Sequence, residues 1–276
     1  MTESAASTAD APLYQKDHLR LRQCRHGMML YNINDRFIGA MLDRYGEFSE
    51  EENEIFRQIV KPGMTVVEAG ANIGVHTLAI AQGVGPSGRV LAFEPQRSVF
   101  QILCANLALN GLEQVEPHWA AMGNVDGVIA VPRLDSARQQ NFGGLALDRQ
   151  QTGDSVRLVR VDSLGLPACH LVKVDVEGME LDVLRGAADT IRRCVPLIYT
   201  ENDRQDRSPA LIGQLQALGY RCFWHLPRCI RMPNFRGNTE NTFPPLMSSN
   251  MLCVPASRDI TVNGLREVMG PQDWWR

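Results

Sequence analysis

The fold is decided by residues 66–74, which read Val-Val-Glu-Ala-Gly-Ala-Asn-Ile-Gly. The first four residues end an apolar, β-branched strand, and the segment after Gly74 has the apolar pattern of a helix over residues 75–82. Gly70 lets the backbone turn sharply after the strand, and Gly74 lets the helix pack close to it. A strand, a glycine turn and a helix are typical of nucleotide-binding α/β domains. An ordinary strand-to-helix turn also favours glycine, so the turn needs a second signal.

The same alternation of strands and helices continues along the chain and predicts an α/β fold with parallel strands and right-handed crossovers. We expect strands at 65–69, 89–93, 115–120, 168–174, 196–200, 221–225 and 251–254, and helices at 75–82, 97–110, 180–194 and 209–218.

Residues before this pattern form an N-terminal extension. Segments 28–32 and 36–42 are expected to make a hairpin, and Ser49 before three glutamates indicates a capping box at the start of a helix. The chain is thus divided into a disordered tail at 1–12, the extension at 13–60, the main domain at 61–256 and a C-terminal segment at 257–276.

Composition excludes several classes of function. A chain of 276 residues with 44% hydrophobic and 21% charged residues can bury one large core. Its net charge of -3 gives no electrostatic reason to bind nucleic acid. Its first residues do not resemble a signal peptide, and no apolar run approaches the ~20 residues that span a bilayer. The seven cysteines show no CxxC spacing, which favours reduced thiols in the cytoplasm. Whether the chain forms a homo-oligomer stays open.

An acid at the end of the second expected strand supplies the second signal. Glu94 stands where a carboxylate can accept two hydrogen bonds from a ribose diol. The turn has the spacing G-x-x-x-G, so Asn72 occupies a position where a dinucleotide site needs glycine. S-adenosylmethionine carries no phosphate, and Glu68 adds negative charge near its ammonium group. The pattern therefore favours S-adenosylmethionine over NAD.

Three motifs resemble the FkbM family of methyltransferases: residues 66–74, residues 88–95 (Gly-Arg-Val-Leu-Ala-Phe-Glu-Pro) and residues 173–180 (Lys-Val-Asp-Val-Glu-Gly-Met-Glu). Shorter matches lie at 45–48 and 249–250, so the resemblance covers roughly residues 26–256. The family more often has Asp at the position of Glu68 and frequently His at that of Asn202. The resemblance implies a seven-stranded sheet of order 3-2-1-4-5-7-6 with the last strand antiparallel. It also implies methyl transfer, usually to a hydroxyl of a sugar or natural product.

The chemistry is expected where the fourth and fifth strands end. Period-2 alternation places Lys173, Asp175 and Glu177 on one face if the strand persists. An alcohol is a poor nucleophile, so methyl transfer calls for a carboxylate base or a metal that acidifies the hydroxyl. Asp175 is the first choice, and Glu177 and Glu201 either share the proton or hold a divalent cation with it. Each carboxylate could instead cap a helix or pair with Lys173.

The long polar segments 132–157 and 226–249 are expected to hold a small-molecule or glycan acceptor. The candidates for binding the cofactor are Glu68, Gly70, Ala71, Asn72, Gly74, Thr77, Glu94, Ala121, Met122 and Asp175; those for binding the acceptor are Asn141, Asn202 and Arg231.

Two other functions remain open at this point. An NAD(P)-dependent oxidoreductase would share the fold, but the glycine pattern disfavours it and no Tyr-x-x-x-Lys pair stands at a suitable place. A scaffold that binds S-adenosylmethionine without catalysis would share the cofactor site. Because a fold does not fix a function, the choice rests on the site residues.

Overall fold

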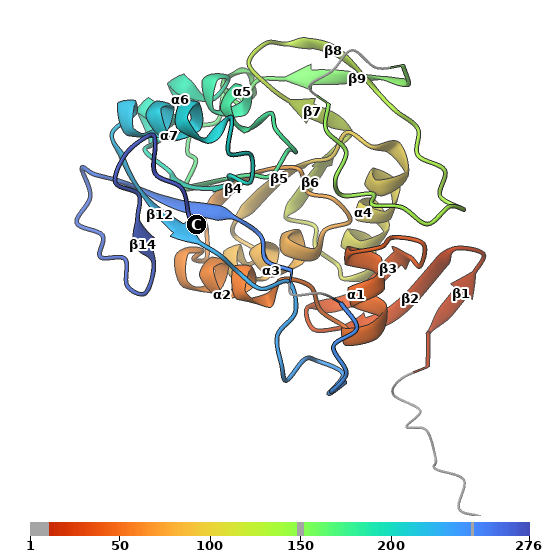
Figure 1. Cartoon of the computed structure of the whole chain (residues 1–276). Coiled ribbons are helices and arrows are strands. Elements are labelled where there is room, and N and C mark those ends of the chain that lie inside the picture. Colours follow the sequence, from red (N-terminus) through yellow and green to blue (C-terminus); the bar gives the residue numbers. More distant parts are fainter. Residues whose placement is uncertain (1–10, 148–151, 244–245) are drawn as a thin grey trace, which may run out of the picture.

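A computed structural model describes residues 11–147, 152–243 and 246–276. Its centre is a mixed sheet with helices on both faces (Figure 1). The order across the sheet is β14-β12-β13-β11-β10-β4-β5-β6. These strands are β4 (Thr65–Ala69), β5 (Arg89–Phe93), β6 (Val115–His118), β10 (Leu171–Val174), β11 (Leu197–Glu201), β12 (Tyr220–His225), β13 (Asn250–Pro255) and β14 (Arg266–Glu267).

Numbered from β4 in chain order without β14, the strands lie in the order 3-2-1-4-5-7-6. The pairs from β6 to β11 are parallel, whereas β13 runs antiparallel to both β11 and β12. The expectation of seven strands is corrected, because the short β14 pairs with β12 and adds an eighth strand at the edge. The order reverses between β4 and β10, and such a switch point is where ligands bind in open α/β sheets.

The helices divide into two layers, visible above and below the sheet in Figure 1. One layer contains α2 (Glu50–Ile59), α3 (Val75–Val84) and α4 (Arg97–Leu109), and the other contains α5 (Glu180–Arg185), α6 (Ala188–Cys194) and α7 (Ser208–Ala217). Alternate residues of each strand feed the two layers: Val66 packs with the first hydrophobic cluster and Val67 with the second. In α4, Val99, Leu103 and Leu107 recur at the four-residue spacing of a buried helical stripe.

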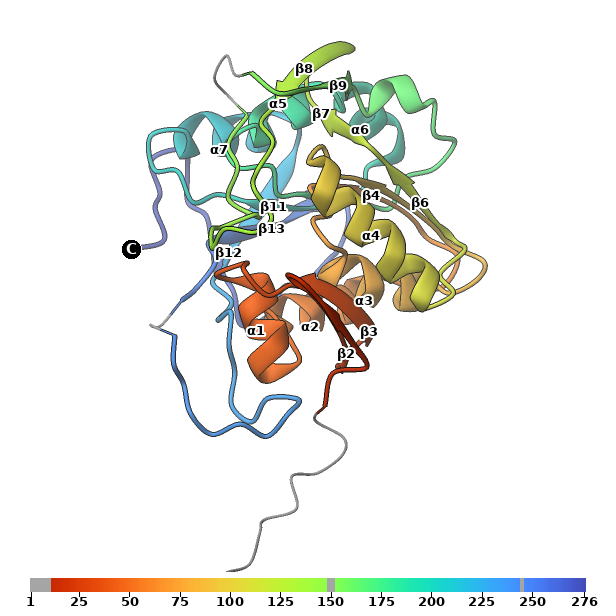
Figure 2. The ribbon, with the colours of Figure 1, turned by 90° about the vertical axis from the view of Figure 1, so that its right-hand side faces the viewer.

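The N-terminal extension differs from its prediction. It forms a three-stranded sheet of β1 (Tyr14–Lys16), β2 (Leu19–Cys24) and β3 (Gly27–Asn32), followed by α1 (Ile38–Tyr45). The expected strand at 36–42 is therefore wrong: Asp35 accepts hydrogen bonds from the N–H groups of Phe37 and Gly39 and so starts a helix there. Figure 2 shows this extension beside α3 and α4. Tyr31 belongs to the first cluster together with residues of the central sheet, so the extension shares that core.

Three further expectations are corrected. Ser49 precedes α2, but its hydroxyl donates to the Glu52 carboxylate and caps no backbone N–H group. The helix expected over 180–194 is interrupted at Gly186, which ends α5. Glycine is required there, because a Cβ would lie 2.0 Å from the carbonyl oxygen of Gly123. The strand expected over 115–120 ends at His118.

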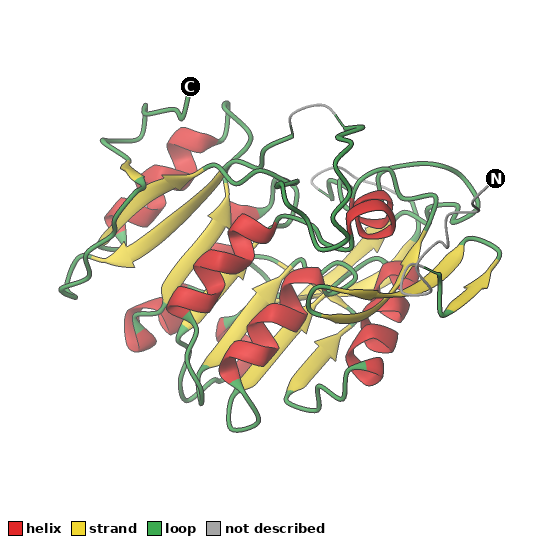
Figure 3. Cartoon of the chain, turned by 90° about the horizontal axis from the view of Figure 1, so that it is seen from below, coloured by secondary structure: helices red, strands yellow, loops and turns green. Residues whose placement is uncertain are grey.

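A second small sheet follows this strand. It has the order β7-β9-β8, with β7 (Ala120–Met122), β8 (Gly127–Val131) and β9 (Asp154–Val159). β9 therefore replaces part of the long loop expected over 132–157. Figure 3 shows the main layers from below, with long loops gathered along one edge of the large sheet. Among the described residues no helix is long and apolar enough to cross a membrane. The expected tail at 1–12 falls mostly outside the described residues.

Candidate active site

A pocket of about 490 Å³ opens where β4, β5, β10 and β11 end. Its cofactor side is formed by the turn after β4 and by Glu94 after β5. Its other side combines the extension, the segment around Asn141 and the loop before β13. The pocket therefore lies beside the switch point, where the strand order alone places a ligand.

The glycine turn is braced against the next strand and against β10. The N–H groups of Gly70 and Ala71 both donate to the carbonyl oxygen of Phe93, at 3.0 and 2.9 Å. Gly70 has φ +82°, and a Cβ there would lie 1.8 Å from the carbonyl oxygen of Asp175. Only glycine fits this place, and its small size lets the turn after β4 approach the end of β10 closely.

Glu94 is joined to the same turn. It is only 4% exposed and accepts hydrogen bonds from the N–H groups of Asn72, at 3.0 Å, and Gln96, at 2.8 Å. Burial raises the pKa of Glu94 to about 7, although these two hydrogen bonds lower it. A carboxylate has about four acceptor positions, so the ionised group retains capacity for two ribose hydroxyls.

A narrow apolar slot of about 40 Å³ continues beyond Glu94. Ala121 and Met122 of β7 line it, as the sequence predicts for an adenine site, together with Leu145, Leu147 and Met179. The slot shares Gly70, Glu94 and Asp175 with the large pocket. An apolar slot for a base, an acid for a ribose and a glycine turn for an amino-acid chain fit the parts of S-adenosylmethionine.

Three carboxylates stand at the ends of β10 and β11. Asp175, Glu177 and Glu201 each offer an oxygen atom within 4.8 Å of the others. Burial is the main cause that raises the pKa of Glu177 to about 7 and that of Glu201 well above its ordinary value, and the nearby Asp175 adds to both. The structure thus brings together the three residues expected to carry the chemistry.

Lys173 lies under this group and is 1% exposed. Its Nζ atom is 3.5 Å from Glu68 and 3.6 Å from Asp175. Burial alone would lower the pKa of Lys173, but the surrounding carboxylates, Asp175 and Glu68 foremost, outweigh it and raise the pKa. Lys173 therefore stays charged between Glu68 and Asp175.

Glu68 and Thr77 take a different place from the one expected. The Thr77 hydroxyl donates to Glu68 at 2.7 Å, and both side chains are completely buried. Neither residue lines the pocket, and the negative charge of Glu68 is directed at Lys173.

Of the three residues expected to bind the acceptor, one lines the pocket and two lie outside it. Asn141 lines the pocket, and its side chain accepts hydrogen bonds from the N–H groups of Gly143 and Gly144. Asn202 is buried against Ser208, to which its amide donates at 2.9 Å. Arg231 lies outside the pocket and pairs with Glu47 and Glu54.

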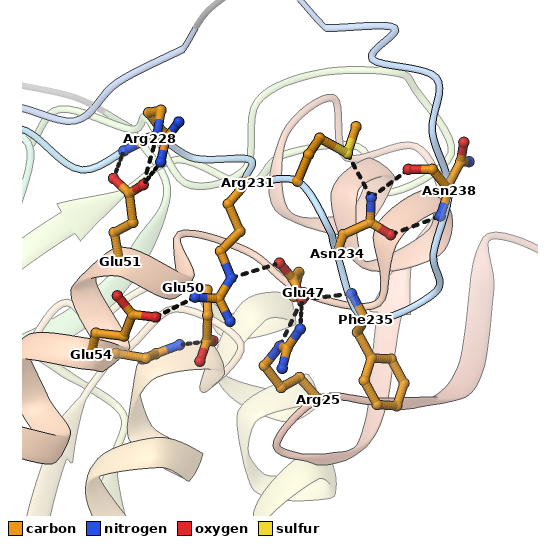
Figure 4. A network of polar contacts seen from close by, with 12 residues as sticks. Arg25, Glu47, Glu50, Glu51, Glu54, Arg228, Arg231, Asn234, Phe235 and Asn238 are labelled. Atoms are coloured by element: carbon orange, nitrogen blue, oxygen red, sulfur yellow. Dashed lines mark hydrogen bonds and ion pairs between the residues drawn. The ribbon is translucent and has the colours of Figure 1, made fainter.

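Arg231 belongs to a network that fastens the late loop to α2 (Figure 4). Arg228 pairs with Glu51, and the N–H group of Phe235 donates to Glu47 at 2.8 Å. Arg25 of the extension also pairs with Glu47. The loop continues from these anchors to residues 246–249, which line the pocket.

Some pocket residues were not predicted from the sequence. Glu52 of α2 is 4% exposed, accepts a 2.6 Å hydrogen bond from Ser49 and lines the pocket with Lys173 and Asp175. Its burial raises its pKa to about 7. One signal was present: Glu52 stands four residues before Phe56, on the apolar face of the helix. The apolar wall of Phe37, Ile38 and Phe48 had no such signal.

Sheet order, glycine turn and the acid after the second strand define an α/β protein that binds a nucleoside-containing cofactor. The chain belongs to the FkbM methyltransferase family: the profile described as "Methyltransferase FkbM domain" matches residues 68–222, more than half of the chain. Its cofactor is S-adenosylmethionine.

Three named methyltransferases are similar to this chain. Methyltransferase 1 of Beauveria bassiana is 33% identical over 146 residues, which are 45% of this chain and 58% of that protein. Methyltransferase sdnD of Sordaria araneosa is 30% identical over 154 residues, or 44% of this chain and 59% of that protein. The chain thus spans less than two thirds of either relative. A solved FkbM methyltransferase from Methylobacillus flagellatus aligns with 18% identity and a TM-score of 0.42 over 72% of this chain and 50% of that one.

Proposed function

We propose that the protein is an O-methyltransferase that methylates a hydroxyl group of a sugar or of another small natural product. The observation that carries the proposal is the group of Asp175, Glu177 and Glu201, which lines the same pocket as the glycine turn. An alcohol holds its proton far above neutral pH, so its attack on a methyl group is assisted by a base at the reacting oxygen.

In this reaction a bond forms between the acceptor oxygen and the methyl carbon, and the bond between that carbon and sulfur breaks. Bound S-adenosylmethionine supplies the electrophilic methyl group. The acceptor proton passes to a carboxylate of the group, for which Asp175 is the first candidate because it lines both the slot and the pocket. Lys173 holds this carboxylate in place from below, at 3.6 Å.

The pocket has room and chemistry for a small acceptor. Its volume lies in the usual range of small-molecule sites, about 300–1,000 Å³. Asn141 and the backbone of Gly143 and Gly144 offer polar contacts, and Phe37 and Phe48 provide an apolar wall. We extend the proposal to a cytoplasmic protein, supported by seven cysteines that are all free in the structure.

A matched pair of acceptors tests the proposal. A methyl glycoside and its amino-sugar analogue, which differ in one hydroxyl or amine, are incubated with the protein and S-adenosylmethionine labelled in the methyl group. We expect label in the hydroxyl compound, and a loss of at least about 100-fold in Asp175→Asn. Transfer to the amine alone, across a panel of such pairs, would show an N-methyltransferase. Binding of S-adenosylmethionine without transfer to either class would favour the non-catalytic scaffold.

A further inference from the structure

The group of Asp175, Glu177 and Glu201 has a geometry that proton transfer alone does not require. Asp175 and Glu177 follow β10, and Glu201 ends the neighbouring β11. One oxygen of each lies within 4.8 Å of the others. Calcium holds oxygen ligands at about 2.3–2.6 Å and magnesium at about 2.0–2.1 Å, so two ligands of one cation stand at most about 4–5 Å apart. The three oxygens are therefore close enough together for one cation to bind all of them.

Glu201 provides a second, independent observation at this group. Its Oε2 atom is shielded from solvent and has no hydrogen-bond partner among the described residues. A buried carboxylate oxygen without a partner is costly, because it has lost water and gained nothing in exchange. A cation at the centre of the group would supply the missing partner.

The charges around the pocket are unbalanced. Carboxyl groups of six residues line it, whereas Lys173 and Arg276 are the basic side chains in its lining; the six are Glu52, Glu94, Asp175, Glu177, Glu201 and Asp203. Lys173 is shared with Glu68 and stays 3.6 Å from Asp175, longer than the ~2.7–2.9 Å of a charged hydrogen bond. Arg204 donates to one oxygen of Glu177, at 3.1 Å. None of these cations pairs with Oε2 of Glu201, which stays without a partner among the described residues.

We propose that Asp175, Glu177 and Glu201 bind one hard divalent cation of the magnesium or manganese class. An all-oxygen ligand set is the set that such ions prefer. Three protein ligands leave positions open for water and for an oxygen of the acceptor. If the proposed function holds, the cation would lower the pKa of the acceptor hydroxyl and orient it. Asp175 would then be a ligand rather than the base, and the proton would pass to a pocket carboxylate outside the group, such as Glu52 or Asp203.

Manganese binding to the full-length, EDTA-treated protein tests this site without an acceptor. Free Mn²⁺ is followed by its electron paramagnetic resonance signal during titration of wild type, Glu201→Gln and Asp206→Asn. Asp206 is exposed and close in sequence, so its variant removes the same charge without touching the group. We expect one saturable site in wild type, affinity at least tenfold weaker in Glu201→Gln, and a change within twofold in Asp206→Asn. Excess Mg²⁺ should displace the bound Mn²⁺.

Two results would overturn the site: no saturable binding to wild type, or equal weakening in Glu201→Gln and Asp206→Asn. Glu177→Gln gives a second variant if Glu201→Gln does not fold, with the same expected loss. S-adenosylmethionine binding is measured on the same samples by calorimetry. Loss of the cation site with intact binding of this ligand rejects the cation alone. A cation site without methyl transfer to any hydroxyl acceptor rejects the proposed function alone.

Discussion

The two halves of the pocket are built in different ways. The cofactor half consists of one continuous turn, from Gly70 to Gly74, and of Glu94, which hydrogen-bonds to that turn. The acceptor half gathers α2, the segment around Asn141, the ends of β10 and β11, and the loop at 226–249. Its residues lie far apart in sequence and meet only after the sheet has formed.

This difference separates two sources of specificity. The cofactor half is held by backbone hydrogen bonds, which tolerate many side chains but require glycine where the backbone is close. The acceptor half is held by ion pairs and buried carboxyl groups, whose strength depends on pH and salt. Changes in the two halves should therefore have different signatures, and four variants measure them.

The largest effect is expected at Gly70, where the two halves touch. Gly70→Ala places a Cβ 1.8 Å from the carbonyl oxygen of Asp175, at a φ of +82°. The clash and the backbone strain should both destabilise the folded state. We therefore expect a loss of about 4 kcal/mol or more in the free energy of unfolding, and no binding of S-adenosylmethionine. Urea denaturation measures the first and calorimetry the second.

Gly111→Ala is the matched control, because Gly111 has φ +62° and open space around its Cα. Its cost should be only about 1 kcal/mol, from the backbone conformation. If both variants lose the same free energy of unfolding, the close approach of Gly70 to Asp175 does not contribute to stability.

The buried carboxyl groups of the acceptor half should make the stability of the protein depend on pH. The pKa of Glu52 is about 7 in the folded protein against an ordinary value of 4.5. Between these values the unfolded chain releases the proton while the folded protein keeps it, so stability falls as pH rises and levels off above pH 7. The fall contributed by Glu52 is at most about 3 kcal/mol.

Glu52→Gln removes this contribution, so the variant should gain stability relative to wild type as the pH is raised from 4.5 to 8. Thermal unfolding across this range measures the effect. Glu54→Gln, on the exposed side of the same helix, should keep the wild-type profile. An unchanged profile in Glu52→Gln would show that the Glu52 carboxyl titrates normally.

The same contrast explains what the sequence predicted. The strands, the glycine turn and Glu94 follow from local patterns, and the meeting of Asp175, Glu177 and Glu201 follows from their places after adjacent parallel strands. The position of Glu68 could not be predicted from the sequence. Its partner Lys173 lies on another strand, and only the register of β4 with β10 sets the two residues opposite each other. The sequence pattern predicted Glu52 only as part of a capping box. Its place in the pocket could not be predicted, because it depends on tertiary packing. Similarly, most of the strand expected over 36–42 belongs to α1, at whose start the Asp35 carboxylate accepts hydrogen bonds from backbone N–H groups.

The cofactor half is tested alone by Glu94→Gln. The amide keeps the size of the side chain but loses the charge and one acceptor oxygen, while the N–H groups of Asn72 and Gln96 still need partners. We expect about 100-fold weaker binding of S-adenosylmethionine and S-adenosylhomocysteine in calorimetry, as for the loss of charged hydrogen bonds. Glu113→Gln, an exposed change at the opposite end of the neighbouring strand β6, should leave the affinity unchanged. Equal affinity in both variants would remove Glu94 from the cofactor site.

The smallest effect is expected where the late loop meets α2. Arg228 and Glu51 pair at the surface, with the Arg228 side chain 64% exposed, so their coupling should be below about 1 kcal/mol and should weaken in salt. A double-mutant cycle of Arg228→Ala and Glu51→Ala, read from thermal unfolding at low and high salt, gives this energy. Hydrogen exchange should become faster in Arg228→Ala at residues 226–243, while the affinity for S-adenosylmethionine should change less than twofold. Within the described residues no ion pair joins this loop to the turn at 70–74 or to Glu94. A larger loss of cofactor affinity would therefore show that the two halves are coupled.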